Sequence, residues 1–262
     1  MRTRMASDAD VYHRTWLHIR ETALKAYFGL DGETSLLDPS TRRPQVTPRV
    51  EAHLDLFNLQ WHVIPCVAAV PFDESYCARL YQRAPAQFTE PLHHGPSVRE
   101  RLAAGHRQYQ GRIVAVEATM KPRYLPDRRQ HYGSAHGFDG SADPLNPYLD
   151  QAGLGRTRYG HNYVTLRHLV QLITADWRRR ELVPVGYRVT LCPPVVFNLI
   201  GTVFHPEWSE TESLEVGYYA EDQSAHCYVV GANGLMDFSY VEPVEPTTDW
   251  KLLGFRIALV PD

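Results

Sequence analysis

Basic and aromatic side chains alternate along residues 121–168, and this mixture is the strongest chemical signal in the sequence. Cations pair with phosphates and flat rings stack on bases, so the mixture is typical of surfaces that bind single-stranded nucleic acid. The alternative is a surface loop whose tyrosines pack on arginine planes. For an RNA, DNA or nucleoprotein partner, the expected contacts are Arg123, Tyr124, Arg128, Arg129, Tyr132, Arg156, Arg158, Tyr159 and Arg167.

Histidines in the same stretch suggest a second chemistry. If a helix begins near residue 162, the spacing places His161, Thr165 and His168 on one face, opposite the stripe from Tyr163 to Trp177. Together with Arg158, these two histidines would grip a phosphate. The alternative function is therefore an enzyme that acts on a phosphate or glycosidic substrate. Its candidate catalytic residues are His161, His168 and His136.

Other catalytic and cofactor motifs do not occur in the sequence. Metal ligands need a characteristic spacing, and no HExxH or HxH pattern organises the potential ligands His131, His136, Asp139, Asp143 and His161. The sequence also contains no GxSxG elbow, no Walker A loop and no GxGxxG. We therefore expect neither a metal ion nor a cofactor.

Charge is distributed unevenly along the chain. Residues 99–188 carry 15 basic and 8 acidic side chains, a net charge of +7, whereas residues 189–262 carry 2 and 11, a net charge of −9. The basic segment is either an anion-binding surface or the partner of the acidic segment within the fold. An acidic sheet that binds other proteins is a third possible function. Arginine outnumbers lysine 24 to 3, a bias that a GC-rich prokaryotic genome also produces.

Composition predicts a globular protein of the cytoplasm. Of 262 residues, 44% are apolar, which suits a normal core. The N-terminus has no apolar signal-peptide region, and no run reaches the roughly 18–20 apolar residues of a membrane span, so we expect no membrane partner. Without any CxxC pair, four cysteines are expected as free thiols: Cys66, Cys77, Cys192 and Cys227.

The N-terminal half reads as helical. Apolar residues at helical spacing, with capping residues before them, predict helices over about 8–28, 48–60, 73–83 and 98–109. The apolar run 63–70 and the segment from Ile113 to Thr119 predict strands. The clearest helix spans about 162–180, with Asn162 as its cap. Three arginines (178–180) in its last turn would favour the helix dipole.

Residues 121–160 stand apart because prolines and glycines break up any apolar period. A loop of this length is typically functional or disordered. After the last helix, short runs near 187–191, 214–219, 226–230, 235–241 and 252–260 predict strands, while 195–204 suits a strand or a helix. Short connections favour an antiparallel meander. The predicted fold is one α+β domain over 1–262, with a helical N-terminal half and an antiparallel sheet in the C-terminal third.

One short motif has a known counterpart. Leu253-Gly-Phe-Arg-Ile-Ala258 resembles the closing strand of formylglycine-generating-enzyme and C-type-lectin-like domains. The resemblance covers six residues, and residues 229–240 lack the Arg-Gly-Gly-Ser-Trp-type segment that should precede it. It therefore implies no activity and no site residue for this chain.

Overall fold

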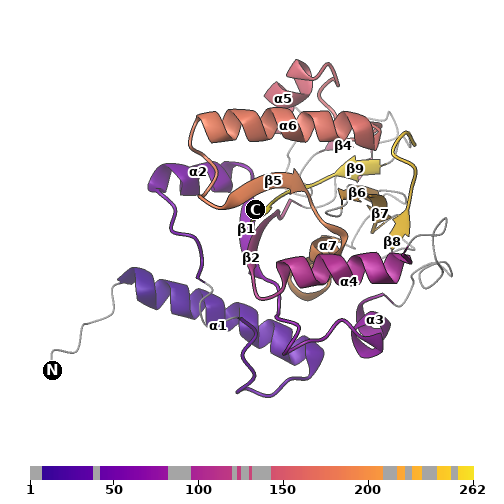
Figure 1. Cartoon of the computed structure of the whole chain (residues 1–262). Coiled ribbons are helices and arrows are strands. Elements are labelled where there is room, and N and C mark those ends of the chain that lie inside the picture. The colour runs from indigo at the N-terminus through magenta and orange to yellow at the C-terminus, as the bar shows by residue number, and fades with distance from the viewer. Residues whose placement is uncertain are drawn as a thin grey trace.

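The helices are distributed along the whole chain (Figure 1). The computed structural model describes residues 8–37, 42–81, 96–119, 123–124, 130–131, 143–208, 217–221, 226–231, 241–248 and 253–262. Its helices are α1 (Asp8–Phe28), α2 (Pro48–Leu56), α3 (Glu74–Leu80), α4 (Val98–Tyr109), α5 (Asn146–Gln151), α6 (Tyr163–Arg179) and α7 (Pro194–Phe204), with a 3₁₀ turn, η3 (Pro206–Trp208).

Most strands follow α6, as the sequence predicts for an α+β fold. The strands are β1 (Leu59–Val63), β2 (Ile113–Glu117), β3 (Arg123–Tyr124), β4 (Gln130–His131), β5 (Tyr187–Leu191), β6 (Gly217–Glu221), β7 (Cys227–Val230), β8 (Val241–Pro243), β9 (Leu253–Phe255) and β10 (Ile257–Pro261). The α+β class, with antiparallel strands concentrated in the C-terminal part, is confirmed.

Local capping explains why the predicted helix starts are correct for α4 and α6. The Ser97 side chain accepts a hydrogen bond from the backbone N–H of Glu100, and the Glu100 carboxylate accepts one from the Ser97 backbone in return. Asn162 caps α6 by accepting from the N–H of Thr165. Pro194 lies in the first turn of α7, so the ambiguous segment 195–204 is helical.

The predicted helix 48–60 and strand 63–70 are wrong in their boundaries. Asn58 adopts a left-handed backbone conformation (φ 49°), which ends α2 and turns the chain directly into β1. Asparagine tolerates this conformation better than most residues. Trp61 therefore lies on a strand, and residues 64–70 form turns after it.

A four-stranded antiparallel sheet, in the order β1-β2-β10-β5, separates two groups of helices (Figure 1). On one side α6 lies along β5, and its Trp177 packs against His53 and Phe57 of the α2 region. On the other side His62 of β1 contacts Phe204 at the end of α7. Alternate residues of a strand point to opposite faces, so the sheet is covered on both.

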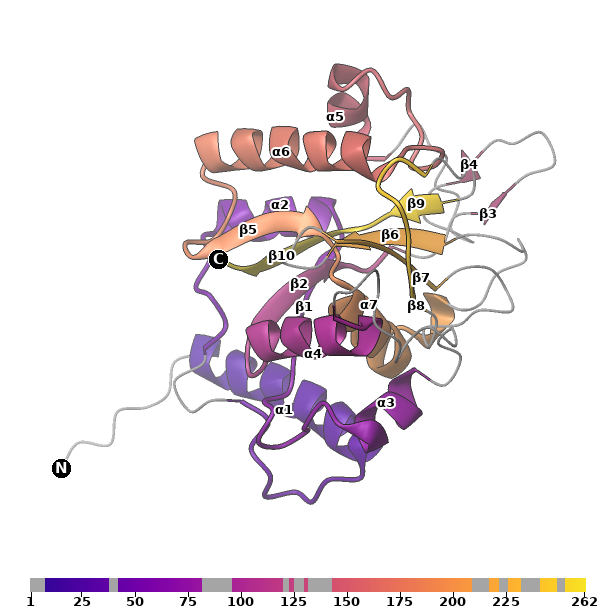
Figure 2. The ribbon, with the colours of Figure 1, turned by 45° about the vertical axis from the view of Figure 1, so that its right-hand side comes forward.

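The second sheet has the order β8-β7-β6-β9 and is connected to the first by the C-terminal segment, which supplies β9 to one sheet and β10 to the other. Strands β6 to β8 form an antiparallel meander, whereas β9 pairs in parallel with β6. Only Arg256 separates β9 from β10, and Figure 2 shows the two running in sequence from one sheet into the other. The C-terminal segment, residues 253–261, is therefore shared by the two sheets, with one strand in each.

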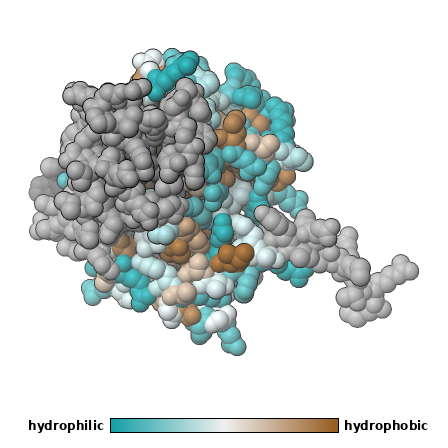
Figure 3. Space-filling view, turned by 180° about the vertical axis from the view of Figure 1, so that it is seen from behind, coloured by the Kyte–Doolittle hydropathy of each residue, from teal (hydrophilic) through white to brown (hydrophobic). Residues whose placement is uncertain are grey.

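Helix α7 lies inside the molecule. Every residue from Pro194 to Gly201 is buried, as expected for a helix that is apolar on all sides. The buried apolar residues form one cluster, to which each of the seven described α-helices contributes; α1 contributes Leu24, in its second half. On the face opposite Figure 1, the described surface is mostly hydrophilic, with apolar residues in small groups (Figure 3). No helix among the described residues is long and apolar enough to cross a membrane.

Part of the predicted long loop has regular structure. Residues 143–160 contain α5 and a series of turns, which the sequence pattern did not indicate. Strands β3 and β4 pair with each other at two positions. The remainder of 120–142 lies outside the described residues.

Candidate nucleic-acid interface

Helix α6 presents one buried face and one charged face. Tyr163, Leu166, Val170, Ile173 and Trp177 are buried, as their helical spacing predicts. Outside this stripe, the exposed polar and basic side chains of α6 and its C-cap are Arg167, His168, Gln171, Arg178, Arg179 and Arg180. Packing of the apolar stripe against the sheet therefore fixes the direction in which these cations point.

A groove runs between α6 and β5 and encloses about 400 Å³. Three arginines line it: Arg167 and Arg178 from α6, and Arg188 from β5. None of its lining residues is acidic; the others are Val170, Gln171, Thr174, Ala175, Val189 and Thr190. A concave surface lined by positive charges attracts anions more strongly than the same charges scattered over a flat surface.

Strand β5 has one edge that no described strand pairs with. Within the described residues, β5 pairs with β10 and with no other strand. The Cys192 N–H donates to the Arg256 carbonyl, and the Asp262 N–H donates to the Gly186 carbonyl, each at 2.9 Å. Because backbone groups alternate in direction along an antiparallel strand, the N–H and C=O of Val189 point away from β10. Val189 is 4% exposed, however, so the groups of the groove that can reach a ligand are chiefly its side chains.

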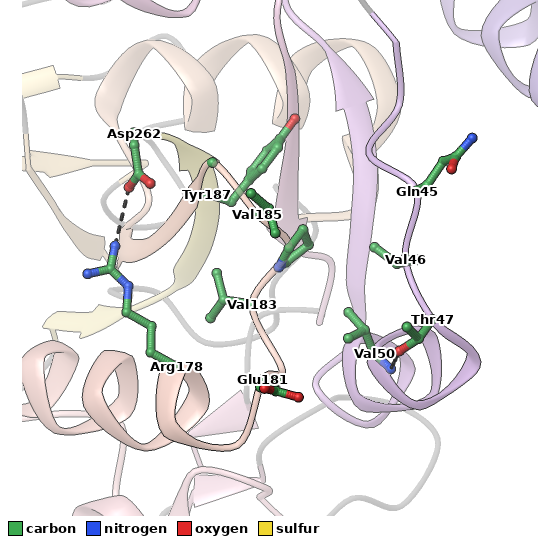
Figure 4. A pocket seen from close by; sticks show the side chains of 12 residues that line it. Gln45, Val46, Thr47, Val50, Arg178, Glu181, Val183, Val185, Tyr187 and Asp262 are labelled. Carbon is green, nitrogen blue, oxygen red and sulfur yellow. Dashed lines mark hydrogen bonds and ion pairs between the residues drawn. The ribbon is translucent and has the colours of Figure 1, made fainter.

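A second cavity of about 520 Å³ shares Arg178 with the groove. Figure 4 shows it between the segment that follows α6 and the start of α2, with Arg178 and Asp262 paired at one side. The Arg178–Asp262 distance is 3.3 Å, and both side chains are about half exposed. The lining residues are Gln45, Val46, Thr47, Val50, Arg178, Glu181, Val183, Pro184, Val185, Gly186, Tyr187 and Asp262.

The last turn of α6 holds the arginine triplet. Asp176 pairs with both Arg179 and Arg180, the latter at 3.2 Å, and its carboxylate accepts a hydrogen bond from the Tyr148 hydroxyl at 2.7 Å. These contacts, led by the Tyr148 hydrogen bond, lower the pKa of Asp176. Two of the three arginines therefore have an acidic partner on their own helix, while Arg178 reaches across to Asp262.

The structure places Arg158 inside the fold. Its guanidinium donates to both oxygens of Glu117 (2.9 and 3.1 Å) and to both oxygens of Asp143 (2.9 Å for one). All three side chains are at least 97% buried. Two neighbouring carboxylates keep Arg158 charged despite its burial, and they raise its pKa. At least four of its five N–H groups are used, so it is not arranged to bind an external phosphate.

Arg256 extends this buried cluster into the shared strand. One of its terminal nitrogens donates to the Glu117 carbonyl at 2.9 Å, and its guanidinium lies 4.1 Å from the ring centre of Trp208. Glu117 also accepts from the Ile257 N–H at 3.3 Å. The cluster thus ties residues 143–158 to β2 and to the junction of the two sheets, which is a structural task.

The other predicted contact residues have different fates. Tyr159 is buried, and a Cβ on Gly254 would lie only 2.7 Å from its ring, so the loop packs directly on β9. Arg156 is exposed and pairs with Asp150 at 3.1 Å. Arg167 lies in the groove. Arg123 and Tyr124 form β3. Arg128, Arg129, Tyr132 and His136 lie outside the described residues.

The two described catalytic candidates lie apart from the groove and from the second cavity. His161 precedes α6 instead of lying on it; it is buried, and its Nε2 is 2.9 Å from the Thr157 carbonyl. His168 is exposed on α6. Neither residue lines the groove or the second cavity. The predicted common face of His161, Thr165 and His168 is therefore wrong, because the helix begins two residues after His161.

The described part of the chain contains neither a cluster of metal-ligating side chains nor a disulfide. No group of three or more His, Cys, Asp or Glu side chains there is arranged to hold a metal ion. All four cysteines are free, and burial raises the pKa of the Cys77 and Cys192 thiols.

Two groove residues carry more of the site than the sequence indicates. From the sequence, Arg178 is expected only to stabilise the dipole of its helix, and Arg188 is expected only to be part of a strand. The available signal is the short connection between the helix ending near 180 and the strand beginning at Tyr187. It forces the helix and the strand to be neighbours, which brings Arg188 beside the last turns of α6.

Comparisons with known proteins add no assignment. The chain matches no family model, no curated protein and no solved structure. The function must therefore be argued from the site itself.

Proposed function

We propose that the protein binds single-stranded nucleic acid, RNA or DNA, with the phosphates lying in the groove between α6 and β5. The observation that carries the proposal is the convergence of Arg167, Arg178 and Arg188 on one groove without an acidic lining residue. Arginine suits this role because its guanidinium stays charged and matches phosphate oxygens with two parallel hydrogen bonds.

Within the groove Arg188 has the clearest role. No ion pair of Arg188 with a carboxylate occurs among the described residues, whereas Arg178 pairs with Asp262. Arg188 can therefore meet a phosphate without first breaking a salt bridge.

Salt dependence gives the direct test. Each phosphate contact on a single strand contributes about −0.7 to the slope of log K against log salt, so three arginines predict a slope of about −2. Fluorescence anisotropy of a labelled twelve-nucleotide strand, at several salt concentrations, measures it. Arg188→Gln should weaken binding at low salt by roughly tenfold and reduce the slope by about 0.7.

Arg107→Gln is the matched control. Arg107 is exposed on α4, on the other side of the sheet from α6, and the substitution removes the same charge. It should leave both affinity and slope near the wild-type values. Absence of binding at low salt, or equal losses in the two variants, would refute the groove as the binding site.

A further inference from the structure

Glu181 occupies a strained backbone position beside the second cavity. Its φ is 57°, in the left-handed region that glycine adopts most readily. The Leu182 N–H donates to the Trp177 carbonyl at 2.8 Å, the bond that closes a Schellman motif after α6. At this position helices usually carry glycine, and a glutamate there costs stability.

Nothing in the described structure compensates Glu181 for this strain. Although it follows three arginines, its carboxylate forms no ion pair or hydrogen bond with any described side chain; those arginines pair with Asp176 and Asp262. The side chain is exposed and lines the cavity. Strained residues gather at functional sites, where an observed outlier motivates a functional hypothesis.

The rest of the cavity suits a flat ring. Tyr187 is held in place because its hydroxyl donates to the Ile113 carbonyl at 2.9 Å and its ring meets Trp61 edge-on. Val183 and Val185 provide apolar surface beside it, and Val185 is 99% exposed. Figure 4 shows Glu181 at the end of α6, on the opposite side of this apolar surface from Asp262. Aromatic and apolar walls with a carboxylate at the edge would hold a ring that carries amino groups.

We infer that the second cavity binds an amino-bearing nucleobase, and that Glu181 accepts hydrogen bonds from its exocyclic amine. This inference rests on the proposed function, because Arg178 lines both cavities and links a base in one to a phosphate in the other. Cytosine offers an N4 amine that acidic side chains recognise, whereas thymine presents a carbonyl at the same position. The site should therefore prefer cytosine to thymine.

Binding of labelled oligo(dC) and oligo(dT) of equal length, at pH 7.5 and one salt concentration, tests this preference. The two strands carry the same charge, so the groove contributes equally to both. Wild-type protein should bind oligo(dC) about tenfold more tightly. Glu181→Gln and Glu181→Gly should both remove most of this preference while leaving oligo(dT) affinity unchanged.

Thermal unfolding separates the role of the carboxylate from that of the backbone. Glu181→Gly should raise the Tm by about 2 °C, since glycine relieves the strain. Asn58→Gly, at the other non-glycine residue with positive φ, is the control and should leave the base preference intact. A Tm that falls in Glu181→Gly would overturn the argument from strain.

The two proposals fail in different ways. Equal affinity for both oligonucleotides in the wild type, with the effect of Arg188→Gln preserved, would overturn the base site alone. If neither oligo(dC) nor oligo(dT) binds, both the groove and the base site are refuted.

Discussion

Two regions of this protein use arginine in opposite ways. Arg158 is 3% exposed and held by Glu117 and Asp143, whereas Arg188 lines an open groove without an acidic lining residue. Both arginines come from the same basic stretch of sequence. Their partners, not their chemistry, separate them. Buried carboxylates hold the Arg158 guanidinium inside the fold, whereas no carboxylate among the described residues pairs with Arg188, which can therefore meet an anion.

The comparison also shows what the positive charge of residues 99–188 means. Arg158 is neutralised inside the fold by Glu117 and Asp143, two of the eight acidic residues already counted in that total, and Asp176 and Asp262 pair with the arginines that end α6. The net charge of the segment therefore does not show which arginines can meet a ligand. Arg107 is exposed on α4, for example, whereas Arg167, Arg178 and Arg188 line the groove.

Removing the buried guanidinium should give the largest effect. Arg158→Met leaves Glu117 and Asp143 without their cation, and breaking a buried pair in this way costs about 3–5 kcal/mol. Urea unfolding measures the loss. Arg156→Ala, which removes an exposed pair two residues earlier, should change stability by less than about 0.5 kcal/mol. A loss below 1 kcal/mol in Arg158→Met would show that the cluster does not stabilise the fold.

Acidification should separate stability from binding. Burial lowers the pKa of His53 and of His106 to about 4, from 6.5 in the unfolded chain. Both histidines are neutral in the folded protein. Their contribution to the free energy of unfolding is therefore complete above pH 6.5 and is lost as the pH falls toward 4. Between pH 6.5 and 5, each of these histidines should lower the free energy of unfolding, measured in urea, by roughly 1–2 kcal/mol.

The groove should not follow this pH dependence, because arginine keeps its charge throughout. Oligonucleotide affinity at pH 5.5, measured where the protein is still folded, should match that at pH 7. In His106→Leu, the free energy of unfolding should fall less between pH 6.5 and 5, by the amount that one histidine contributes. A flat wild-type profile would contradict burial of neutral histidines.

The smallest effect is expected at Asp262. Asp262→Asn frees Arg178 from an exposed ion pair that contributes less than about 1 kcal/mol, so oligonucleotide binding should tighten by roughly threefold. Asp150→Asn is the control, since Asp150 pairs with Arg156 and does not line the groove. Equal effects in the two variants would mean that overall charge, and not Arg178, sets the affinity.

Local signals explain which parts of the fold were predictable. Ser97 with Glu100, and Asn162 with Thr165, fix helix starts within a few residues of sequence, so α4 and α6 were predicted closely. The end of α2 depends on the left-handed conformation of Asn58, a choice that apolar spacing does not reveal. Helix α5 is six residues long and lies in a proline-rich stretch, which hides its pattern.

The site was harder to predict because tertiary contacts assemble it. The sequence points to Arg167, which lines the groove, but it cannot show that Glu117 lies beside Arg158, 41 residues away. Arg188 became a site residue only when β5 was placed along α6. Residue type suggests what kind of ligand to test, whereas contacts with acidic residues distant in sequence decide which described arginines are already paired.

The strand that runs through β9 and β10 has a consequence for folding. β10 lies between β2 and β5, so the central sheet stays split into separate pieces until residues 257–261 insert. Pairing between segments so distant in sequence is slow, because the chain must close a large loop before any contact forms. Until that insertion, the edges of β2 and β5 are open to other chains, and folding yield should depend on protein concentration more than native stability would suggest.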